Sequence, residues 1–247
     1  MYLTTQGLVL RVTDYNDRDA LLTLLTPNHG KITAKARGLR RKNSPLTAPC
    51  QLLAYGNYTL FENAGRYTIN EATSIALFQG VQREITKLAL GTYFAQAAEL
   101  LSQEDLPNPE LLSLVLNCLY ALSEGKFSEE KVKAVFELRA ACIAGYMPDL
   151  GGCHNCGEEQ AQLFDLSEGR LECALCSHAA LGTIRFPVSL GTLQAMRYIV
   201  SCEPKRLFAF SLSDENMVQL SQVTEAYLTT QLERGFSALD FYKSLFV

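Results

Sequence analysis

The chain has 247 residues, 48% of them hydrophobic, and a formal net charge of -4. That is enough apolar material for one large core or two smaller ones, and we expect two domains. No apolar run approaches the roughly 18 residues of a membrane span, and the start lacks the cationic and apolar regions of a signal peptide, so we expect a cytoplasmic protein with no membrane association.

The first 75 residues have the pattern of short strands. In GLVLRV, alternation puts Leu8, Leu10 and Val12 on one face, and ALLTLLT is a β-compatible run that ends at the turn NHG. Further strands are expected at KITAKAR, around residues 55 to 61 and around residues 66 to 73. Five short strands in this length predict a small barrel of the oligonucleotide/oligosaccharide-binding (OB) type over residues 1–78.

A basic stretch, KITAKARGLRRK, occupies residues 31 to 42 and contains no carboxylate. Alternation sends its first three cations to the outward face of a strand, and the next three follow on a loop. A run of this kind is often only a solvated face, but on an OB barrel we predict that it binds nucleic-acid phosphates. The predicted set is Lys31, Lys35, Arg37, Arg40, Arg41 and Lys42, with Arg11, Arg18 and Arg66 as candidates to widen the patch.

The distribution of charge supports a polyanionic partner for this part of the chain. Residues 1 to 75 hold nine Lys or Arg against five Asp or Glu, whereas the remainder is acidic. Single-strand binders usually add stacking aromatics, and the chain has no tryptophan. The candidates are Tyr15, Tyr58 and Tyr67, although core or turn packing is the simpler interpretation of each.

From about residue 80 the hydrophobic period becomes helical. We expect helices ending near Pro107, over residues 110 to 122, and from Ser128 to a stop at Gly145. After an interruption at about 150 to 182, helices should resume at about residues 190 to 200 and 214 to 233. The predicted fold is therefore multidomain β + α: an N-terminal five-stranded OB barrel, then an α-helical domain over residues 79–247 with an insert.

The insert contains two CxxC pairs, Cys153-x2-Cys156 and Cys173-x2-Cys176. Each pair can place two thiolates on one metal, and the 16-residue spacer lets four sulfurs close a tetrahedron around zinc. Four protein ligands leave no open position, so we predict one structural zinc per chain. The alternative is four buried or redox-active thiols.

The other candidate ligands have plainer interpretations. His154 and His178 lie beside the knuckles and could replace a thiolate, but exposed loop histidines are the simpler interpretation. The remaining cysteines stand in apolar contexts typical of small core residues. They are Cys50, Cys118, Cys142 and Cys202.

No nucleotide-binding loop, dinucleotide fingerprint, HExxH or GxSxG motif is present, so we expect no enzymatic activity. Asp14, Asp17 and Asp19 stand close together and could hold magnesium, but a solvated turn is the simpler interpretation.

Several segments resemble the RecO family of bacterial recombination mediators. They are GLVLRVTDYNDRDALLTLLTPNHGKITAKARGLRR, FELRAACIAGYMPDLGGCHNCG and CALC, which occur in the family's order. The resemblance covers most of the chain and weakens in the C-terminal helices. One departure is Cys50, where many relatives have an aromatic residue.

The resemblance implies a function in DNA repair and homologous recombination. Members of the family bind single- and double-stranded DNA, anneal complementary strands, and act with RecR to load RecA on DNA coated with single-strand-binding protein. It implies a nucleoid-associated protein in the cytoplasm, whose helical domain engages single-strand-binding protein; Lys133 and Arg139 lie in the matching region. The rival interpretations are a zinc-stabilised RNA-binding or translation accessory protein, and a metal-dependent nuclease that uses the three aspartates.

Overall fold

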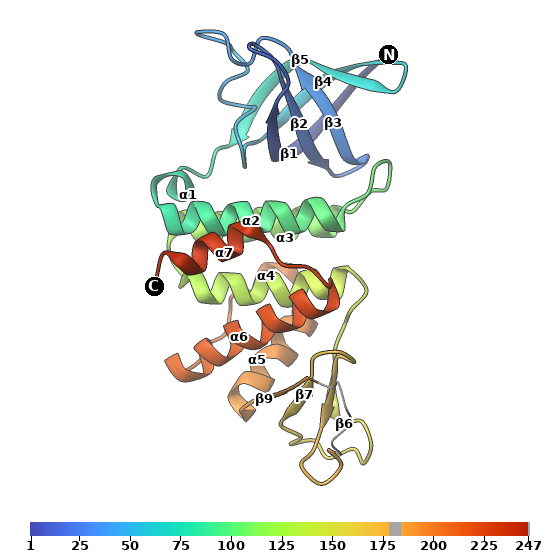
Figure 1. Ribbon diagram of the computed structural model, residues 1–247, viewed down its shortest axis with the longest axis vertical. Helices are drawn as coiled ribbons and strands as arrows, with labels where there is room; N and C mark the ends of the chain where they lie inside the picture. The colour runs from blue at the N-terminus through green and yellow to red at the C-terminus, as the bar shows by residue number, and fades with distance from the viewer. Residues whose placement is uncertain (178–183, 247) are drawn as a thin grey trace. The chain divides into compact units, whose positions relative to one another are not determined.

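A computed structural model describes residues 1–177 and 184–246 (Figure 1). The chain divides into two compact units, one of residues 1–125 with 236–247 and one of residues 126–235. The sequence-based boundary between residues 78 and 79 stays a prediction, because the unit that holds the barrel also includes helices that precede and follow the second unit in the sequence.

The first unit begins with a closed barrel of five strands (Figure 1). The strands are β1 (Tyr2–Asp14), β2 (Ala20–Thr26), β3 (Gly30–Ala36), β4 (Tyr55–Asn63) and β5 (Arg66–Ala76). Their order is β1-β2-β3-β5-β4, and β1 also pairs with β4. Every pairing is antiparallel except the short parallel one between β3 and β5. The predicted five-stranded barrel is confirmed.

Alternation along β3 follows the prediction. Ile32, Ala34 and Ala36 are buried in the barrel core, while Arg37 just beyond the strand is exposed. In β1 the simple alternation fails, because the register shifts between Val9 and Arg11. Such a β-bulge moves the residues after it to the other face. Val12 therefore packs against the barrel core on the same face as Val9, whereas simple alternation would put the two on opposite faces.

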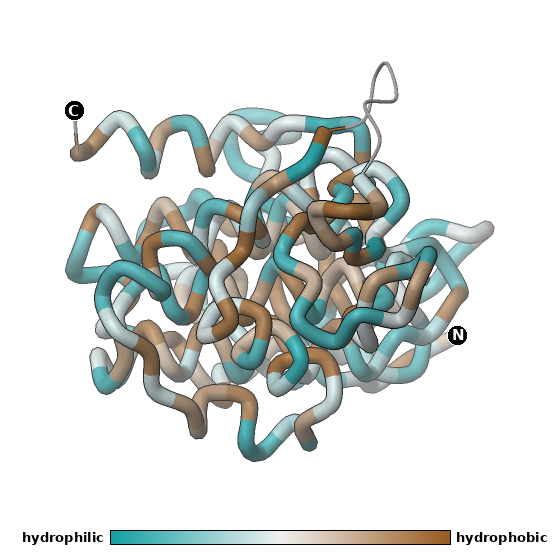
Figure 2. The backbone as a smooth tube through the Cα atoms, turned by 90° about the horizontal axis from the view of Figure 1, so that it is seen from below, coloured by the Kyte–Doolittle hydropathy of each residue, from teal (hydrophilic) through white to brown (hydrophobic). Residues whose placement is uncertain are grey.

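Four helices complete the first unit: α1 (Gln79–Arg83), α2 (Ile85–Leu101), α3 (Pro109–Glu124) and α7 (Ser237–Ser244). The start of α3 is set by Asn108, whose side chain accepts a hydrogen bond from the backbone N–H of Leu111, and by a proline in the first turn. Hydrophobic and hydrophilic residues alternate along α7 at the C-terminus (Figure 2), because this helix buries one face.

Helix α2 and the segment after it are joined to the barrel by specific bonds. Arg11 on β1 forms an ion pair of 2.9 Å with Glu99. Gly30 has a φ of +60°, and a Cβ there would lie 2.4 Å from the carbonyl oxygen of Gln103. Only glycine tolerates both the positive φ and this close approach, so the NHG turn is adapted to the segment that packs on it.

The second unit is helical with a small inserted sheet. Its helices are α4 (Glu129–Ile143), α5 (Leu190–Ser201) and α6 (Asp214–Gln231), with a 3-10 turn at Pro204–Arg206. The insert forms a four-stranded sheet in the order β6-β8-β7-β9. Its strands are β6 (Asp149–Cys153), β7 (Leu163–Asp165), β8 (Arg170–Glu172) and β9 (Arg185–Pro187). The predicted helical region with an insert is confirmed.

Serine side chains cap all three helices of this unit. Ser128, Ser189 and Ser213 each accept a hydrogen bond from a backbone N–H in the first turn that follows. Among the residues that the structure describes, no helix combines the length and the apolar character needed to cross a membrane.

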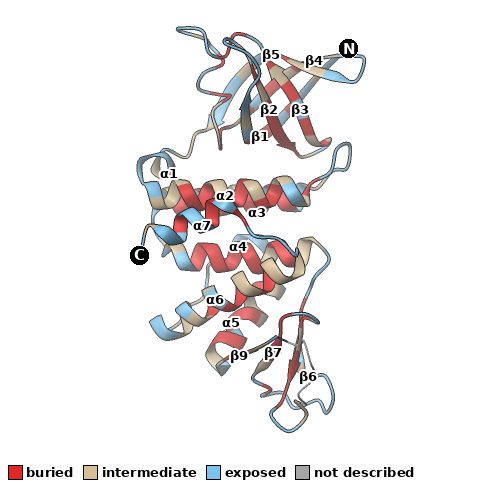
Figure 3. Ribbon diagram, in the orientation of Figure 1, coloured by how far each residue is buried: buried red, intermediate tan, exposed pale blue. Residues whose placement is uncertain are grey.

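Helix α4 is buried over most of its length (Figure 3) and carries a buried charge cluster. The Nζ atom of Lys133 lies 3.1 Å from a carboxylate oxygen of Glu137 and 2.8 Å from one of Glu225 on α6. It also donates to the backbone oxygen of Ser221, at 3.0 Å. Lys133 is only 3% exposed, so its ammonium group is a structural tie between two helices.

Glu137 is fully buried and accepts a hydrogen bond from the hydroxyl of Thr224, at 2.8 Å. Burial raises the pKa of Glu137 from its ordinary 4.5 to about 7, against the opposing charge of Lys133. A raised folded-state pKa means that the folded protein favours the protonated acid. The stability contributed by this group is therefore lost as the pH rises from about 4.5 to about 7.

Replacing Lys133 with methionine should leave two acidic groups without their buried cation. We expect the free energy of unfolding to fall by about 3–5 kcal/mol at pH 8, and by less at pH 5, where Glu137 is protonated. Urea unfolding of variant and parent at both pH values measures this. Lys87→Met, which breaks a pair with the exposed Glu84, should cost less than about 1 kcal/mol. Equal losses at both pH values for Lys133→Met would contradict the assignment.

Candidate metal centre and nucleic-acid interface

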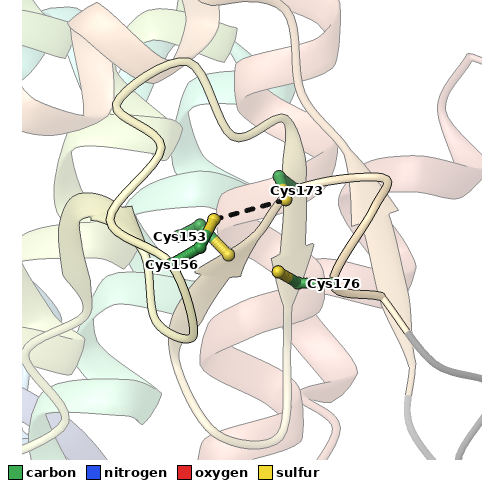
Figure 4. A group of neighbouring side chains, drawn as sticks. All are labelled: Cys153, Cys156, Cys173 and Cys176. Atoms are coloured by element: carbon green, nitrogen blue, oxygen red, sulfur yellow. Dashed lines mark hydrogen bonds between the residues drawn. The ribbon is translucent and has the colours of Figure 1, made fainter.

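Four cysteines of the insert converge on one point (Figure 4). Cys153 ends β6 and Cys156 lies in the turn after it, while Cys173 and Cys176 lie in the turn that follows β8. Strands β6 and β8 are hydrogen-bonded neighbours, which brings the two knuckles together. All four sulfur atoms lie within 4.8 Å of one another, and those of Cys156 and Cys173 are 3.7 Å apart.

The backbone of each knuckle folds tightly around its first cysteine. The N–H of Gly157 donates to the carbonyl of Cys153 at 2.8 Å, and the N–H of Ser177 donates to the carbonyl of Cys173 at 2.9 Å. These turns aim both thiols of a pair in one direction. The CxxC spacing thus has the local geometry that a tetrahedral metal requires.

The electrostatics of the cluster also suit a cation. Burial opposes ionisation of Cys153, but hydrogen bonds from the backbone of Cys173 and Cys156 lower the pKa of its thiol to about 6. Hydrogen bonding with Cys156 and Cys173 raises the pKa of Cys176 to about 12. Four crowded thiols cannot all ionise together without a positive charge between them. The donor set therefore fits a divalent metal with affinity for sulfur.

The other predicted ligand candidates lie outside this cluster. His154 is exposed and is not part of the four-residue group, and His178 falls outside the described residues. Cys50 and Cys118 are buried at 1% and 0% exposure, as expected of core residues. Cys142 and Cys202 are only partly buried.

Arg197 on α5 is a site-supporting residue that the sequence did not indicate. Its Nε donates to the carbonyl of Leu150 at 2.7 Å, and its terminal nitrogen donates to that of Glu159 at 3.0 Å. One guanidinium therefore attaches the backbone on both sides of the first knuckle to a helix. An isolated arginine in an amphipathic helix carries no sequence signal for such a role.

Two of the three aspartates near the first turn of the barrel, Asp14 and Asp19, are engaged by cations, while Asp17 is exposed. Two guanidinium nitrogens of Arg40 donate hydrogen bonds to one carboxylate oxygen of Asp14, at 3.0 and 2.6 Å. Asp19 lies 2.9 Å from the Nζ of Lys35 and accepts the N–H of Gly38 at 2.8 Å. The hydrogen bond from Gly38, then those from Lys35 and Asn16, lower the pKa of Asp19 to about 2. These carboxylates anchor the basic loop.

Four of the nine predicted DNA-binding cations have partners within the chain. Lys35 and Arg40 pair with the aspartates, Arg11 pairs with Glu99, and Lys31 donates to the backbone oxygen of Glu99 at 3.0 Å. Within the described residues, the other five have no carboxylate at ion-pair distance and are exposed. They are Arg18, Arg37, Arg41, Lys42 and Arg66.

Three of these unpaired cations, Arg37, Arg41 and Lys42, line one groove of about 790 Å³ on the barrel. We call it the basic groove. Its other walls are β5 around residues 68 to 73 and an aromatic pair, Tyr2 on β1 and Phe61 on β4. The structure thus gathers positive charge and exposed rings in one hollow.

The predicted stacking aromatics are placed elsewhere. Tyr58 is fully buried, and its hydroxyl donates to the carbonyl of Pro49, so it is a core residue. Tyr15 is 57% exposed and lies under the Nζ of Lys35, 4.5 Å from the ring centre. Tyr67 is partly buried beside the barrel core. Sequence reasoning missed Tyr2 and Phe61, because only the pairing of β1 with β4 brings these distant residues together.

The two predicted partner-binding residues both bond within the second unit. Lys133 belongs to the buried cluster described above, and Arg139 donates to the backbone oxygen of Val200 at 2.8 Å. The bonds of Lys133 are structural, and a contact with a partner would first have to break them. A role of either residue in binding a partner stays a prediction.

The metal centre leads to a direct test. We expect purified protein to contain about one zinc per chain, because four thiolates at this spacing favour tetrahedral zinc. Cys153→Ser or Cys176→Ser should release the metal and lower the thermal stability of the insert. Cys202→Ser, which removes a thiol outside the cluster, should keep it. Elemental analysis that finds no zinc, with all four thiols reactive in the native protein, would contradict the assignment.

Comparison with known proteins agrees with this architecture. The family model described as Recombination protein O N terminal matches residues 1–78, and the one described as Recombination protein O C terminal matches residues 82–240. DNA repair protein RecO of Acetivibrio thermocellus is 31% identical over 99% of this chain and 97% of its own length. DNA repair protein RecO of Bacillus subtilis is 28% identical over 92% of this chain and 88% of its own. The chain therefore belongs to the RecO family of DNA repair and recombination proteins.

Proposed function

We propose that this protein binds single- and double-stranded DNA through its barrel and anneals complementary strands. The observation that carries the proposal is the basic groove, where three exposed cations have no carboxylate partner among the described residues. Membership of the RecO family supports DNA as the polyanion in place of another acidic partner.

The proposed mechanism is electrostatic. Two complementary strands repel each other through their phosphates, and a cationic surface lowers the free energy of bringing them together. Contacts to phosphates carry no sequence information, so base pairing between the strands supplies the specificity. Over residues 38–49 the loop holds Arg40, Arg41 and Lys42 against a single asparagine, Asn43, and no glutamine, so phosphate contacts outnumber groups that read base edges.

In this proposal the protein acts with RecR to help load RecA on DNA coated with single-strand-binding protein. It performs this in the cytoplasm near the nucleoid, without catalysing a covalent step. The four-cysteine cluster holds a structural zinc, because four protein ligands leave no position for water or substrate. Removal of the metal should therefore act on the fold of the insert and leave the barrel's DNA contacts in place.

The two rival functions have less support. An RNA-binding accessory protein would share the barrel and the basic groove, and family membership favours DNA repair over it. A nuclease that uses the aspartate cluster would need carboxylates free to bind metal, whereas Asp14 and Asp19 are bonded to Arg40 and Lys35.

The salt dependence of binding tests the electrostatic mechanism. If about four to six phosphates are neutralised, log affinity for single strands should fall with log salt at a slope of about -3 to -4. Replacing Arg37, Arg41 and Lys42 with alanine should weaken binding to unrelated sequences alike and make the slope shallower by about two. Fluorescence anisotropy at several salt concentrations measures both.

Arg40→Ala is the matched control, because this arginine is on the same loop but already bonded to Asp14. It should make the slope shallower by less than about 0.7, which is the contribution of one phosphate contact. Normal binding and an unchanged slope in a folded triple variant would place the DNA site elsewhere.

Annealing tests the remaining part of the proposal. The protein should anneal complementary DNA oligonucleotides without any nucleotide, because no nucleotide-binding loop is present. Faster annealing of RNA than of DNA would favour the accessory-protein interpretation. Magnesium-dependent cleavage of the strands would favour the nuclease. Both reactions can be followed on labelled oligonucleotides in one gel assay.

A further inference from the structure

Two aromatic rings lie exposed on the barrel wall. Tyr2 is 62% exposed and Phe61 41% exposed. Their ring centres are 5.3 Å apart, with the ring planes inclined at 55°. The two residues are direct partners in the register of β1 and β4, so the closed barrel holds them together. Paired apolar rings left open to water indicate a surface that contacts something else.

The rings and the unpaired cations belong to the same hollow. The basic groove has Tyr2 and Phe61 on its wall together with Arg37, Arg41 and Lys42. Glu71 is the one carboxylate among its lining residues, against three cations. Aromatic faces beside Lys and Arg are the combination that single-stranded nucleic acid requires, since bases stack on rings while phosphates meet cations.

The position of this hollow differs from the usual ligand site of the fold. OB barrels most often bind along strands 2 and 3, with the loops between strands 1 and 2 and between strands 4 and 5. Here the outward cations of β3 are occupied: Lys31 is bonded to the backbone of Glu99, and Lys35 to Asp19. Of the five unpaired cations, Arg18 and Arg66 stand at the β1–β2 and β4–β5 connections. The other three lie together beside β5 and the ends of β1 and β4.

We propose that the basic groove is a base-stacking site for unpaired DNA, in which Tyr2 and Phe61 stack against bases and the three cations bind the adjoining phosphates. This inference rests on the proposed function, because it specifies where and how the barrel holds a single strand. Bases in a duplex already stack on one another and present only their edges. The rings therefore favour unpaired strands over duplex.

Such selectivity has a consequence for annealing. A site that holds bases by their faces binds the separate strands and loses those contacts once the bases stack within a duplex. The paired product is then retained only through its phosphates. Binding the reactants more tightly than the product allows the protein to release the duplex and to act again.

A single substitution gives a direct readout of stacking. The chain has no tryptophan, so Tyr2→Trp places the only one in the groove. A single-stranded oligonucleotide of thymidines should quench its fluorescence, whereas a duplex of equal length should quench it much less. As a comparison, Tyr120→Trp reports from a similarly exposed position, 59%, on α3, and should not respond. Equal quenching at both positions, or none at Tyr2→Trp while the oligonucleotide is bound, would overturn the proposal.

Affinity measurements supply the second arm. Tyr2→Ala with Phe61→Ala should weaken single-strand binding by about fivefold or more, as expected from the loss of base stacking on aromatic rings. It should weaken duplex binding by a smaller factor, so the ratio of the two affinities falls. Tyr2→Phe, which keeps the ring, should retain the parent's ratio. Tyr120→Ala should also leave the ratio as it is in the parent.

The outcomes separate this inference from the proposed function. If the double variant keeps the parent's ratio and only the cation variants lose affinity, the protein binds DNA by charge alone and the stacking site is wrong. If Tyr15→Ala lowers the ratio instead, the strand follows the usual β2–β3 face. If the parent binds no DNA, the proposed function itself fails. Quenching of Tyr2→Trp by a polyglutamate peptide and not by the oligonucleotide would assign the groove to an acidic protein segment.

Discussion

Closure of the barrel through β1 is the constraint on which the arrangement of the N-terminal part depends. This strand is hydrogen-bonded to β2 along one edge and to β4 along the other. Closure leaves no free sheet edge and buries the apolar faces of all five strands in one core. The same closure brings Tyr2 beside Phe61, and the parallel contact between β3 and β5 places the basic loop beside β5. The basic groove and the barrel core therefore both follow from the same strand order.

Some cations on the barrel are paired with carboxylates of the chain, and the others are exposed and open to a ligand. Asp14, Asp19 and Glu99 hold cations that stiffen the first turn, the basic loop and the junction with α2. A loop anchored in this way presents its remaining cations at defined positions, which reduces the ordering entropy lost on binding. The sequence count of positive residues thus overstates the charge offered to DNA, because part of it stabilises the surface that carries the rest.

The second unit uses a different source of stability. Its insert has four strands of only three to five residues, too short to form a large apolar core. The cysteine cluster joins the ends of the neighbouring strands β6 and β8, and Arg197 ties the first knuckle to α5. In the helices, Lys133 joins α4 to α6 through two carboxylates, a buried arrangement whose charges must all be satisfied together. A cysteine cluster whose donor set fits a metal and a buried ion cluster therefore join neighbouring elements of this unit.

The sequence by itself determined the five barrel strands, the longer helices and the four-cysteine cluster. Strand alternation, helical period, serine caps and the CxxC pairs are local patterns, and each depends on residues a few positions apart. The barrel class followed from the number and spacing of the strands. Each knuckle depends on local backbone geometry, so a linear pattern is sufficient to predict it, and the pairing of β6 with β8 brings the two together.

Only the tertiary structure decided which of the predicted site residues are available. Lys35 and Asp19 are 16 positions apart, Arg40 and Asp14 are 26 apart, and Tyr2 and Phe61 are 59 apart, yet each pair is in contact. The bulge in β1 put Val12 on the core face with Val9, and the burial of Tyr58 removed that tyrosine from the stacking candidates. Ion pairing, ring contacts and exposure depend on distances through space, which strand register and barrel closure set and which a linear pattern does not contain.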